Sequence, residues 1–325
     1  MQKPDLNETC EEACSSHDVS TNSPAHDASP ERHLPRERRR IRPWEEAKLE
    51  DRLVAAELKP SPTTKVERIP RRWDRLVRLV GENGICKLMT ARVMVVGLGG
   101  VGSYAVEALA RSAVGNLTIV DFDDVCVTNV NRQLQAFPGT VGQSKANLLA
   151  ERIKAINPDA NVDSVQAFYE PANSKALLSP RPSYVIDAID NVTAKLHLVA
   201  TCLREEIPIV SCTGSGARLD PTLVRVDDLS RTRLDPLARV MRKELSRHGF
   251  DLTKEVGLPV VFSEEEIAEP EPPSWDKAGF KCICPHAEDS PHACEKRRKI
   301  YGTASFVTAS FGMAAASPVV RHLTK

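Results

Sequence analysis

The sequence predicts an α/β protein with a doubly wound, mostly parallel sheet, and two patterns lead to that fold class. Short strand-like segments alternate with segments whose apolar residues recur at helical spacing, between about residues 91 and 216. The first strand-like segment ends in a glycine turn, Gly97-x-Gly99-x-x-Gly102, and a helical pattern follows directly. Strands that alternate with helices join by right-handed crossovers into a parallel sheet, which binds ligands at the carboxyl ends of its strands.

Five segments predict the strands of this sheet. They lie at residues 91–99, 116–123, 161–168, 183–190 and 207–216. The first of them is a continuous apolar run, which is typical of a strand that is buried on both faces. Helices are predicted between the strands, at residues 103–112, 143–157 and 191–206. In the second helix Ala146, Leu149 and Ile153 share one face, and Asn157-Pro158 ends it.

After residue 216 the regular alternation stops. A basic amphipathic helix is predicted at residues 235–249, a strand at 257–266 and a further helix within the uncharged segment Ile300–Val320. That last segment is long enough to span a bilayer, but Gly, Ser, Thr and Ala dominate it and Pro318 interrupts it. We therefore expect a C-terminal helix that packs on the sheet, and no membrane contact.

Two parts of different character are expected along the chain. Residues 1–68 are polar, are rich in Pro, Ser, Glu and Arg, and lack a sustained hydrophobic period, which is typical of a disordered extension. Residues 69–325 make up the expected α/β domain, within which residues 264–298 form an irregular insertion.

The composition argues against several classes of function. The 325 residues include 44 basic and 44 acidic ones, so bulk charge does not favour nucleic acid, although a local basic surface remains open. Nine cysteines, an odd number scattered through an ordinary globular sequence, point to a reducing compartment. The amino terminus has early acidic residues and no apolar core, unlike a signal peptide. A cytoplasmic location is expected.

The glycine turn is the first candidate binding site. Gly97, Gly99 and Gly102 let the chain turn tightly and let a phosphate approach backbone N–H groups, and Gly100 lies in the same turn. The helix that follows points its positive end at that phosphate. Asp121 closes the second strand, where a carboxylate accepts hydrogen bonds from ribose hydroxyls; its alternative role is that of a turn residue. These features fit NAD as well as ATP.

Two cations decide between these nucleotides. Arg132 and Lys145 are placed to meet phosphates, with Asn129 as a neutral hydrogen-bonding partner. Glycine-turn amides usually satisfy the pyrophosphate of NAD, whereas a triphosphate needs side-chain cations and usually magnesium. Asp190, at the end of the fourth strand, could hold that metal through water; its alternative role is to cap the helix that follows. The sequence therefore favours ATP with Mg²⁺ over NAD.

Four motifs together resemble the ubiquitin-activating-enzyme-like (ThiF/MoeB-type) adenylyltransferases, a family with a Rossmann-like fold. They are GLGGVGS from residue 97, DFDDV from residue 121, NVNRQ from residue 129 and VGQSKA from residue 141. The resemblance implies ATP–magnesium binding and adenylation of a carboxylate, with catalytic roles for Arg132, Lys145 and Asp190 and the metal near Asp190. The nucleotide-binding residues that it implies are Gly97, Gly99, Gly100, Gly102, Asp121, Asp123, Asn129, Arg132, Gln133, Lys145 and Asp190.

Further motifs are similar to the tRNA threonylcarbamoyladenosine dehydratases, over about residues 72–262 and again in the terminal helix. The most discriminating is the run DPT…DL…T…DPL between residues 220 and 237. In that family ATP activates the threonyl carboxylate of a modified adenosine beside the tRNA anticodon, and the side group closes into a ring with loss of water. The resemblance implies tRNA as a partner and a homodimer. The first 70 residues and residues 264–298 depart from the family pattern.

Other functions remain open as alternatives. Relatives in the superfamily adenylate the C-terminal Gly-Gly of a sulfur-carrier protein, in some cases through an enzyme thiol, and a sulfur-transfer protein would then be a partner. Cys126, Cys202 and Cys212 are the thiol candidates, although a buried cysteine usually behaves as a small apolar residue. An NAD-dependent dehydrogenase is disfavoured by the two cations, and a non-catalytic nucleotide sensor by the full set of ATP residues.

Three further groups of residues have two interpretations each. The first group contains residue types that bind zinc, namely Cys282, Cys284, His286, His292 and Cys294. Their spacing is not that of a standard zinc site, so the interpretation as incidental cysteines in a surface loop is favoured.

The second group is basic and consists of Arg231, Arg233, Arg239, Arg242, Lys243 and Arg247, with KRRK at 296–299. It is either a surface that suits a tRNA backbone or a solvated helix face. The superfamily often sends an arginine to the partner subunit's ATP, and the candidates here are Arg72, Arg75 and Arg78.

Overall fold

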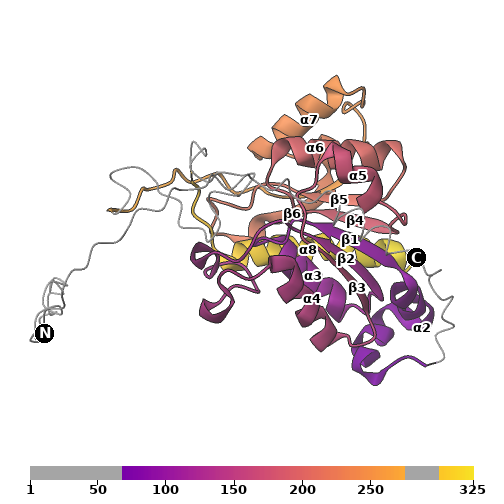
Figure 1. Ribbon diagram of the computed structural model, residues 1–325. Coiled ribbons are helices and arrows are strands. Elements are labelled where there is room, and N and C mark those ends of the chain that lie inside the picture. Colours follow the sequence, from indigo (N-terminus) through magenta and orange to yellow (C-terminus); the bar gives the residue numbers. More distant parts are fainter. Residues whose placement is uncertain (1–67, 275–299) are drawn as a thin grey trace, which may run out of the picture. The chain divides into compact units, whose positions relative to one another are not determined.

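A seven-stranded sheet forms the centre of the molecule, in the order β3-β2-β1-β4-β5-β7-β6 (Figure 1). The computed structural model describes residues 68–274 and 300–325. Neighbouring strands run parallel, except that β6 is antiparallel to β7 at one edge. The prediction of a doubly wound, mostly parallel sheet is therefore confirmed. The expected extension at residues 1–67 lies outside the described residues, as do residues 275–299 of the expected insertion.

The strands match the predicted segments, with one addition. The bounds are β1 Arg92–Val96, β2 Asn116–Val120, β3 Asn161–Val165, β4 Tyr184–Asp187, β5 Ile209–Cys212, β6 Val224–Asp228 and β7 Pro259–Ser263. The sequence did not predict β6, because this edge strand contains charged residues and leaves Arg225 and Val226 exposed. It forms by pairing with β7, which lies more than 30 residues further along the chain.

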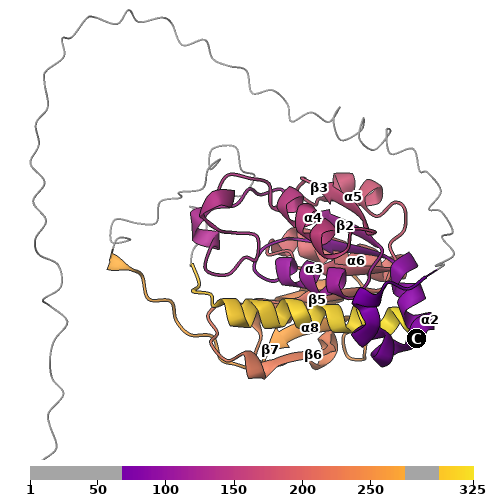
Figure 2. The ribbon, with the colours of Figure 1, turned by 90° about the horizontal axis from the view of Figure 1, so that it is seen from below.

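Helices cover both faces of the sheet (Figures 1 and 2). One hydrophobic cluster packs α2, α3, α4 and α8 against one face, and a second packs α5, α6 and α7 against the other. Their bounds are α2 Asp74–Thr90, α3 Gly102–Arg111, α4 Lys145–Ile156, α5 Pro171–Leu177, α6 Val192–Arg204, α7 Pro236–Arg247 and α8 Ser305–Leu323. The sequence missed α2, which is kinked at Gly81, and α5, which is only seven residues long.

The C-terminal helix lies on the sheet, as expected. Its span differs from the prediction, because α8 begins at Ser305 and continues through Pro318 to Leu323. Its small residues let it approach α3 closely: a Cβ atom at Gly312 would collide with the carbonyl oxygen of Val101. Within the described residues, no helix has the length and apolar character that a membrane span requires.

Parallel packing brings several loops to one edge of the sheet. The glycine turn follows β1, Asp121 follows β2, and residues 188–191 follow β4. Because β1 lies between β2 and β4, these three loops are neighbours. This edge is the place where a doubly wound sheet binds its ligands.

Candidate nucleotide-binding and active site

The four glycines of the turn differ in how closely neighbouring atoms surround them. Gly97 has a φ of +88°, and a Cβ atom there would lie 2.5 Å from the carbonyl oxygen of Ala188. A Cβ atom at Gly102 would collide with the carbonyl of Gly97, and one at Gly100 would lie 3.2 Å from Thr308 of α8. At Gly99 the nearest atom to a Cβ would be Nε2 of Gln133 at 3.8 Å, an ordinary van der Waals distance. Of these four glycines, Gly99 therefore has the least crowded surroundings.

Asp121 ties the glycine turn to the loop after β2. Its carboxylate is buried and accepts hydrogen bonds from the Leu98 N–H at 2.6 Å and from the Asp123 N–H at 2.8 Å. Burial raises the pKa of Asp121, and the charge of Lys145 opposes that rise. The carboxylate retains further lone pairs, which could accept hydrogen bonds from ribose hydroxyls.

Lys145 is the buried cation of the site. It is the first residue of α4 and is 5% exposed, and its Nζ lies 2.8 Å from Oδ2 of Asp123. Burial by itself lowers the pKa of Lys145, but the carboxylates of Asp121, Asp123 and Asp190 together raise it above its ordinary value. Lys145 therefore carries its charge at neutral pH.

The loop after β2 holds Asn129, Arg132 and Gln133. The side chain of Asn129 is buried and accepts a hydrogen bond from the Cys126 N–H at 3.0 Å, which shapes the loop. Arg132 donates to the Thr128 carbonyl at 2.7 Å, and its stem lies against the glycine turn, since a Cβ atom at Gly100 would be 3.3 Å from its Cγ. Gln133 is buried beside Gly99.

Asp190 lies close enough to Lys145 to affect its pKa. Asp190 is exposed, whereas the neighbouring Asn191 caps α6 by accepting a hydrogen bond from the Ala194 N–H at 3.0 Å. The alternative role of Asp190 as the helix cap is therefore wrong. The structure brings Asp121, Asp123, Lys145 and Asp190 together, as the motifs implied.

A buried ion pair beneath this loop was missed by the sequence interpretation. Lys195 of α6 and Asp187 of β4 are fully buried, with Nζ and Oδ2 2.7 Å apart. Ser211 donates to the same carboxylate oxygen at 2.6 Å, and Asp187 accepts from the Ile189 N–H at 3.0 Å. The pair thus fixes the start of the loop that carries Asp190. Asp187, a charged residue at the end of the otherwise apolar strand β4, was the sequence signal that could have revealed this ion pair.

A second buried pair lies after β5. Arg218 donates to Asp235 at 3.0 Å, and both side chains are 1% exposed. Asp235 also accepts from the Thr213 hydroxyl at 2.9 Å and caps α7 through the Ala238 N–H at 2.9 Å. Arg218 additionally binds the carbonyl of Gly214. The pair therefore joins the loop after β5 to the start of α7, and the Asp-Pro pair at residue 235 was its sequence signal.

The cysteines of this region do not have the character of activated nucleophiles. Burial raises the pKa of Cys212 to about 12, and it raises the pKa of Cys202 to about 12 as well. Cys126 is also buried, and its Sγ lies 3.2 Å from the hydroxyl of Thr128. The described residues contain no group of three metal-ligating His, Cys, Asp or Glu side chains. The proposed zinc ligands between Cys282 and Cys294 lie outside those residues.

The basic residues after the sheet fall into two groups. Arg231 pairs with Asp227 and Glu255, Arg242 donates to the Thr232 carbonyl at 3.0 Å, and Arg247 pairs with Glu244 at 2.8 Å. Three others are exposed: Arg233, Arg239 and Lys243. The segment KRRK lies outside the described residues. Arg231 and Arg247 are exposed as well, so all of these described residues except Arg242 lie at the solvent surface.

The fold and this site define a nucleotide-binding α/β protein, with a glycine turn, a buried carboxylate after β2 and a buried cation at one edge of the sheet. The chain belongs to the ThiF family, whose model matches residues 73–325, and within it to the tRNA threonylcarbamoyladenosine dehydratases. It is 40% identical over 257 residues to the tRNA threonylcarbamoyladenosine dehydratase of Escherichia coli, an alignment that covers 78% of this chain and 93% of the relative.

Two further similarities bear on the function. The crystal structure of the Escherichia coli dehydratase in complex with ATP matches with a TM-score of 0.67 and 39% identity, over 78% of this chain and 93% of that one. The molybdopterin-synthase adenylyltransferase of Escherichia coli is 36% identical over 151 residues, which cover 46% of this chain and 59% of the relative. The similarity to the dehydratase therefore extends over much more of the chain.

Proposed function

We propose that this protein dehydrates threonylcarbamoyladenosine beside the anticodon of tRNA, and that it uses ATP to activate the carboxylate as an acyl adenylate. The observation that carries the proposal is the buried Lys145 among Asp121, Asp123 and Asp190, with Asp121 hydrogen-bonded to the glycine turn through the Leu98 N–H. The chain that carries this arrangement is 40% identical to a tRNA threonylcarbamoyladenosine dehydratase, and the alignment covers 93% of that relative.

The residues fit ATP. Gly99, which has no close contact and lies just before the first turn of α3, would let a phosphate approach the backbone N–H groups of the turn. Asp121 would hold the ribose, and Lys145 and Arg132 would face the phosphates. The substrate carboxylate attacks the α-phosphorus, and pyrophosphate leaves. Lys145 then stabilises negative charge that grows on the leaving group, which is the kind of contact that lowers a barrier.

Ring closure needs no enzyme nucleophile. The carbamoyl group of the substrate attacks the activated carbonyl, AMP leaves with its oxygen, and one proton is lost, so the substrate loses one water in total. The high pKa of the Cys212 thiol, about 12, supports this direct route over a thioester. The role of the protein is to hold the carboxylate in line with the α-phosphorus.

Magnesium, a homodimer and a cytoplasmic location are part of the proposal. The exposed carboxylate of Asp190 near Lys145 fits a water-mediated magnesium ligand, and the ion would neutralise triphosphate charge. Of the candidate arginines for a second subunit, Arg72 pairs with Asp159 and Arg78 with Asp74, which favours Arg75 among the described residues. The odd number of cysteines, nine, supports a reducing compartment.

The test uses tRNA that carries threonylcarbamoyladenosine. Incubation with ATP and magnesium should lower the mass of the modified nucleoside by one water and release AMP. NAD should show negligible binding by calorimetry under conditions in which ATP binds. If a carrier protein that ends in Gly-Gly drives AMP formation and modified tRNA does not, the alternative function as a sulfur-carrier adenylyltransferase replaces this one, and a sulfur-transfer protein becomes the expected partner.

A further inference from the structure

A second cavity lies at the edge of the sheet opposite the nucleotide site. It has a volume of about 510 Å³, within the usual range for small-molecule sites. Its lining includes Tyr184, Ile209 and Pro259, the first residues of β4, β5 and β7. The candidate nucleotide-binding residues follow the carboxyl ends of the strands, whereas Tyr184, Ile209 and Pro259 lie at the amino ends of their strands. The two sites are therefore separated by the length of the strands.

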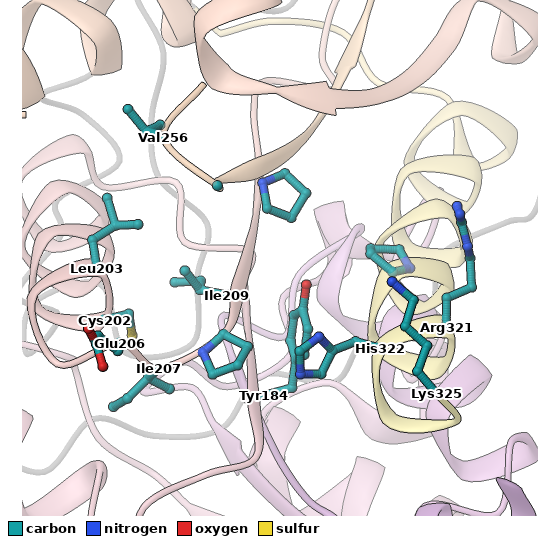
Figure 3. A pocket seen from close by; sticks show the side chains of 14 residues that line it. Tyr184, Cys202, Leu203, Glu206, Ile207, Ile209, Val256, Arg321, His322 and Lys325 are labelled. Carbon is teal, nitrogen blue, oxygen red and sulfur yellow. The ribbon is translucent and has the colours of Figure 1, made fainter. Parts of the chain in front are cut away.

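An apolar wall and the hydroxyl of one tyrosine characterise this cavity. Leu203, Ile207, Ile209 and Val256 supply apolar side chains (Figure 3). Tyr184 is 4% exposed, and Figure 3 shows its ring pointing into the cavity. The Tyr184 hydroxyl has no hydrogen bond to the described residues and is not among their fully buried polar atoms, so it is open to the cavity. Burial raises its pKa to about 12, so it remains a neutral donor.

Two side-chain cations, Arg321 and Lys325, lie on one side of the cavity together with the imidazole of His322. Arg321 and His322 lie in the last turn of α8, and Lys325 follows it; all three line the cavity and are exposed. His322 packs edge-to-face on the Tyr184 ring, with centroids 5.3 Å apart. Glu206 lines the opposite side (Figure 3). An anionic group is therefore favoured near α8, beside the tyrosine hydroxyl.

We propose that this cavity binds a small carboxylate with an apolar body. The carboxylate accepts a hydrogen bond from Tyr184 and is attracted by Arg321 and Lys325, while the apolar body packs against Ile207 and Ile209. A hydroxyl that opens into the cavity between apolar side chains and two cations suits this class of ligand better than a free inorganic anion, which would gain nothing from the apolar wall.

The test compares three probes by calorimetry with the full chain: 3-phenylpropionate, its neutral amide and inorganic phosphate. Saturable binding of 3-phenylpropionate, stronger than that of either other probe, is expected. Tyr184→Phe keeps the ring and should weaken that binding about fivefold, as expected for one lost hydrogen bond. Arg321→Gln together with Lys325→Ala should weaken it about tenfold. Lys175→Ala removes an exposed lysine of α5 outside the cavity and should leave it unchanged.

Several results would overturn the proposal. The proposal is wrong if 3-phenylpropionate shows no saturable binding, or if the amide or phosphate binds as tightly as 3-phenylpropionate. It is also wrong if the Tyr184→Phe variant binds 3-phenylpropionate with unchanged affinity. Far-ultraviolet circular dichroism and thermal unfolding establish that each variant is folded. If Tyr184→Phe does not fold, the double variant of Arg321 and Lys325, which are both exposed, decides in its place. ATP binding in the same samples reports on the nucleotide site separately.

Discussion

Replacement of Lys145 by alanine is the most direct test of the proposed chemistry. The side chain is 6% exposed, and its Nζ lies 2.8 Å from Asp123. Because so little water reaches the ammonium group, a charge that develops beside it is poorly screened. We expect kcat of Lys145→Ala to fall about 100-fold or more, equivalent to about 2.7 kcal/mol in the barrier, with a smaller change in KM for ATP.

The assay is the rate of AMP release with modified tRNA at saturating ATP. Lys154→Ala is the matched control, since it removes an exposed lysine from the last turn of the same helix. The pKa of Lys145 is raised, so its charge persists through neutral pH and is lost only as the pH rises above the ordinary value of 10.5. A folded Lys145→Ala variant with unchanged kcat would refute the reasoning and leave Lys145 as a structural ion pair.

Three further predictions concern the core of the domain. Lys195→Met leaves the carboxylate of Asp187 buried without its cation, so it should lower the free energy of unfolding, measured in urea, by about 3–5 kcal/mol. A second change, Asp187→Asn, should restore part of that loss. If it restores none, the two side chains do not act as a pair. Gly312→Ala should lower it by about 1–3 kcal/mol, because the added Cβ atom collides with the Val101 carbonyl; a neutral result would show that α3 and α8 separate without cost. Cys212→Ala should retain dehydratase activity, since a thiol with a pKa of about 12 is protonated at neutral pH; a folded but inactive variant would indicate a covalent intermediate.

Local patterns predicted most of the fold. The five strand segments and the main helices were found because apolar runs and helical spacing report burial directly. The elements that were missed depend on distant partners or are weak locally. The edge strand β6 exists through its pairing with β7, and α2 carries two glycines, at residues 81 and 84, that interrupt its pattern.

The family resemblance also implied which residues would lie together at the candidate nucleotide site. Asp121 follows β2, Lys145 begins α4 at the end of that same connection, and Asp190 follows β4; the parallel sheet brings the ends of these two strands to one edge. The fully buried pair of Lys195 and Asp187 was not predicted, because burial of a charge depends on the whole surrounding core rather than on neighbours in the chain.

The sequence by itself therefore determined the fold class, the glycine turn and the adenylyltransferase motifs, since each depends on residues that are close in the chain. Only the tertiary structure separated the roles of the glycines: Gly97, Gly100 and Gly102 are constrained by Ala188, Thr308 and the turn itself, whereas a Cβ atom at Gly99 would have no neighbour closer than 3.8 Å. It also placed the first residues of β4, β5 and β7 beside the end of α8, around a cavity of about 510 Å³. Contacts of that kind join residues more than a hundred positions apart, and their geometry arises only when the whole core packs.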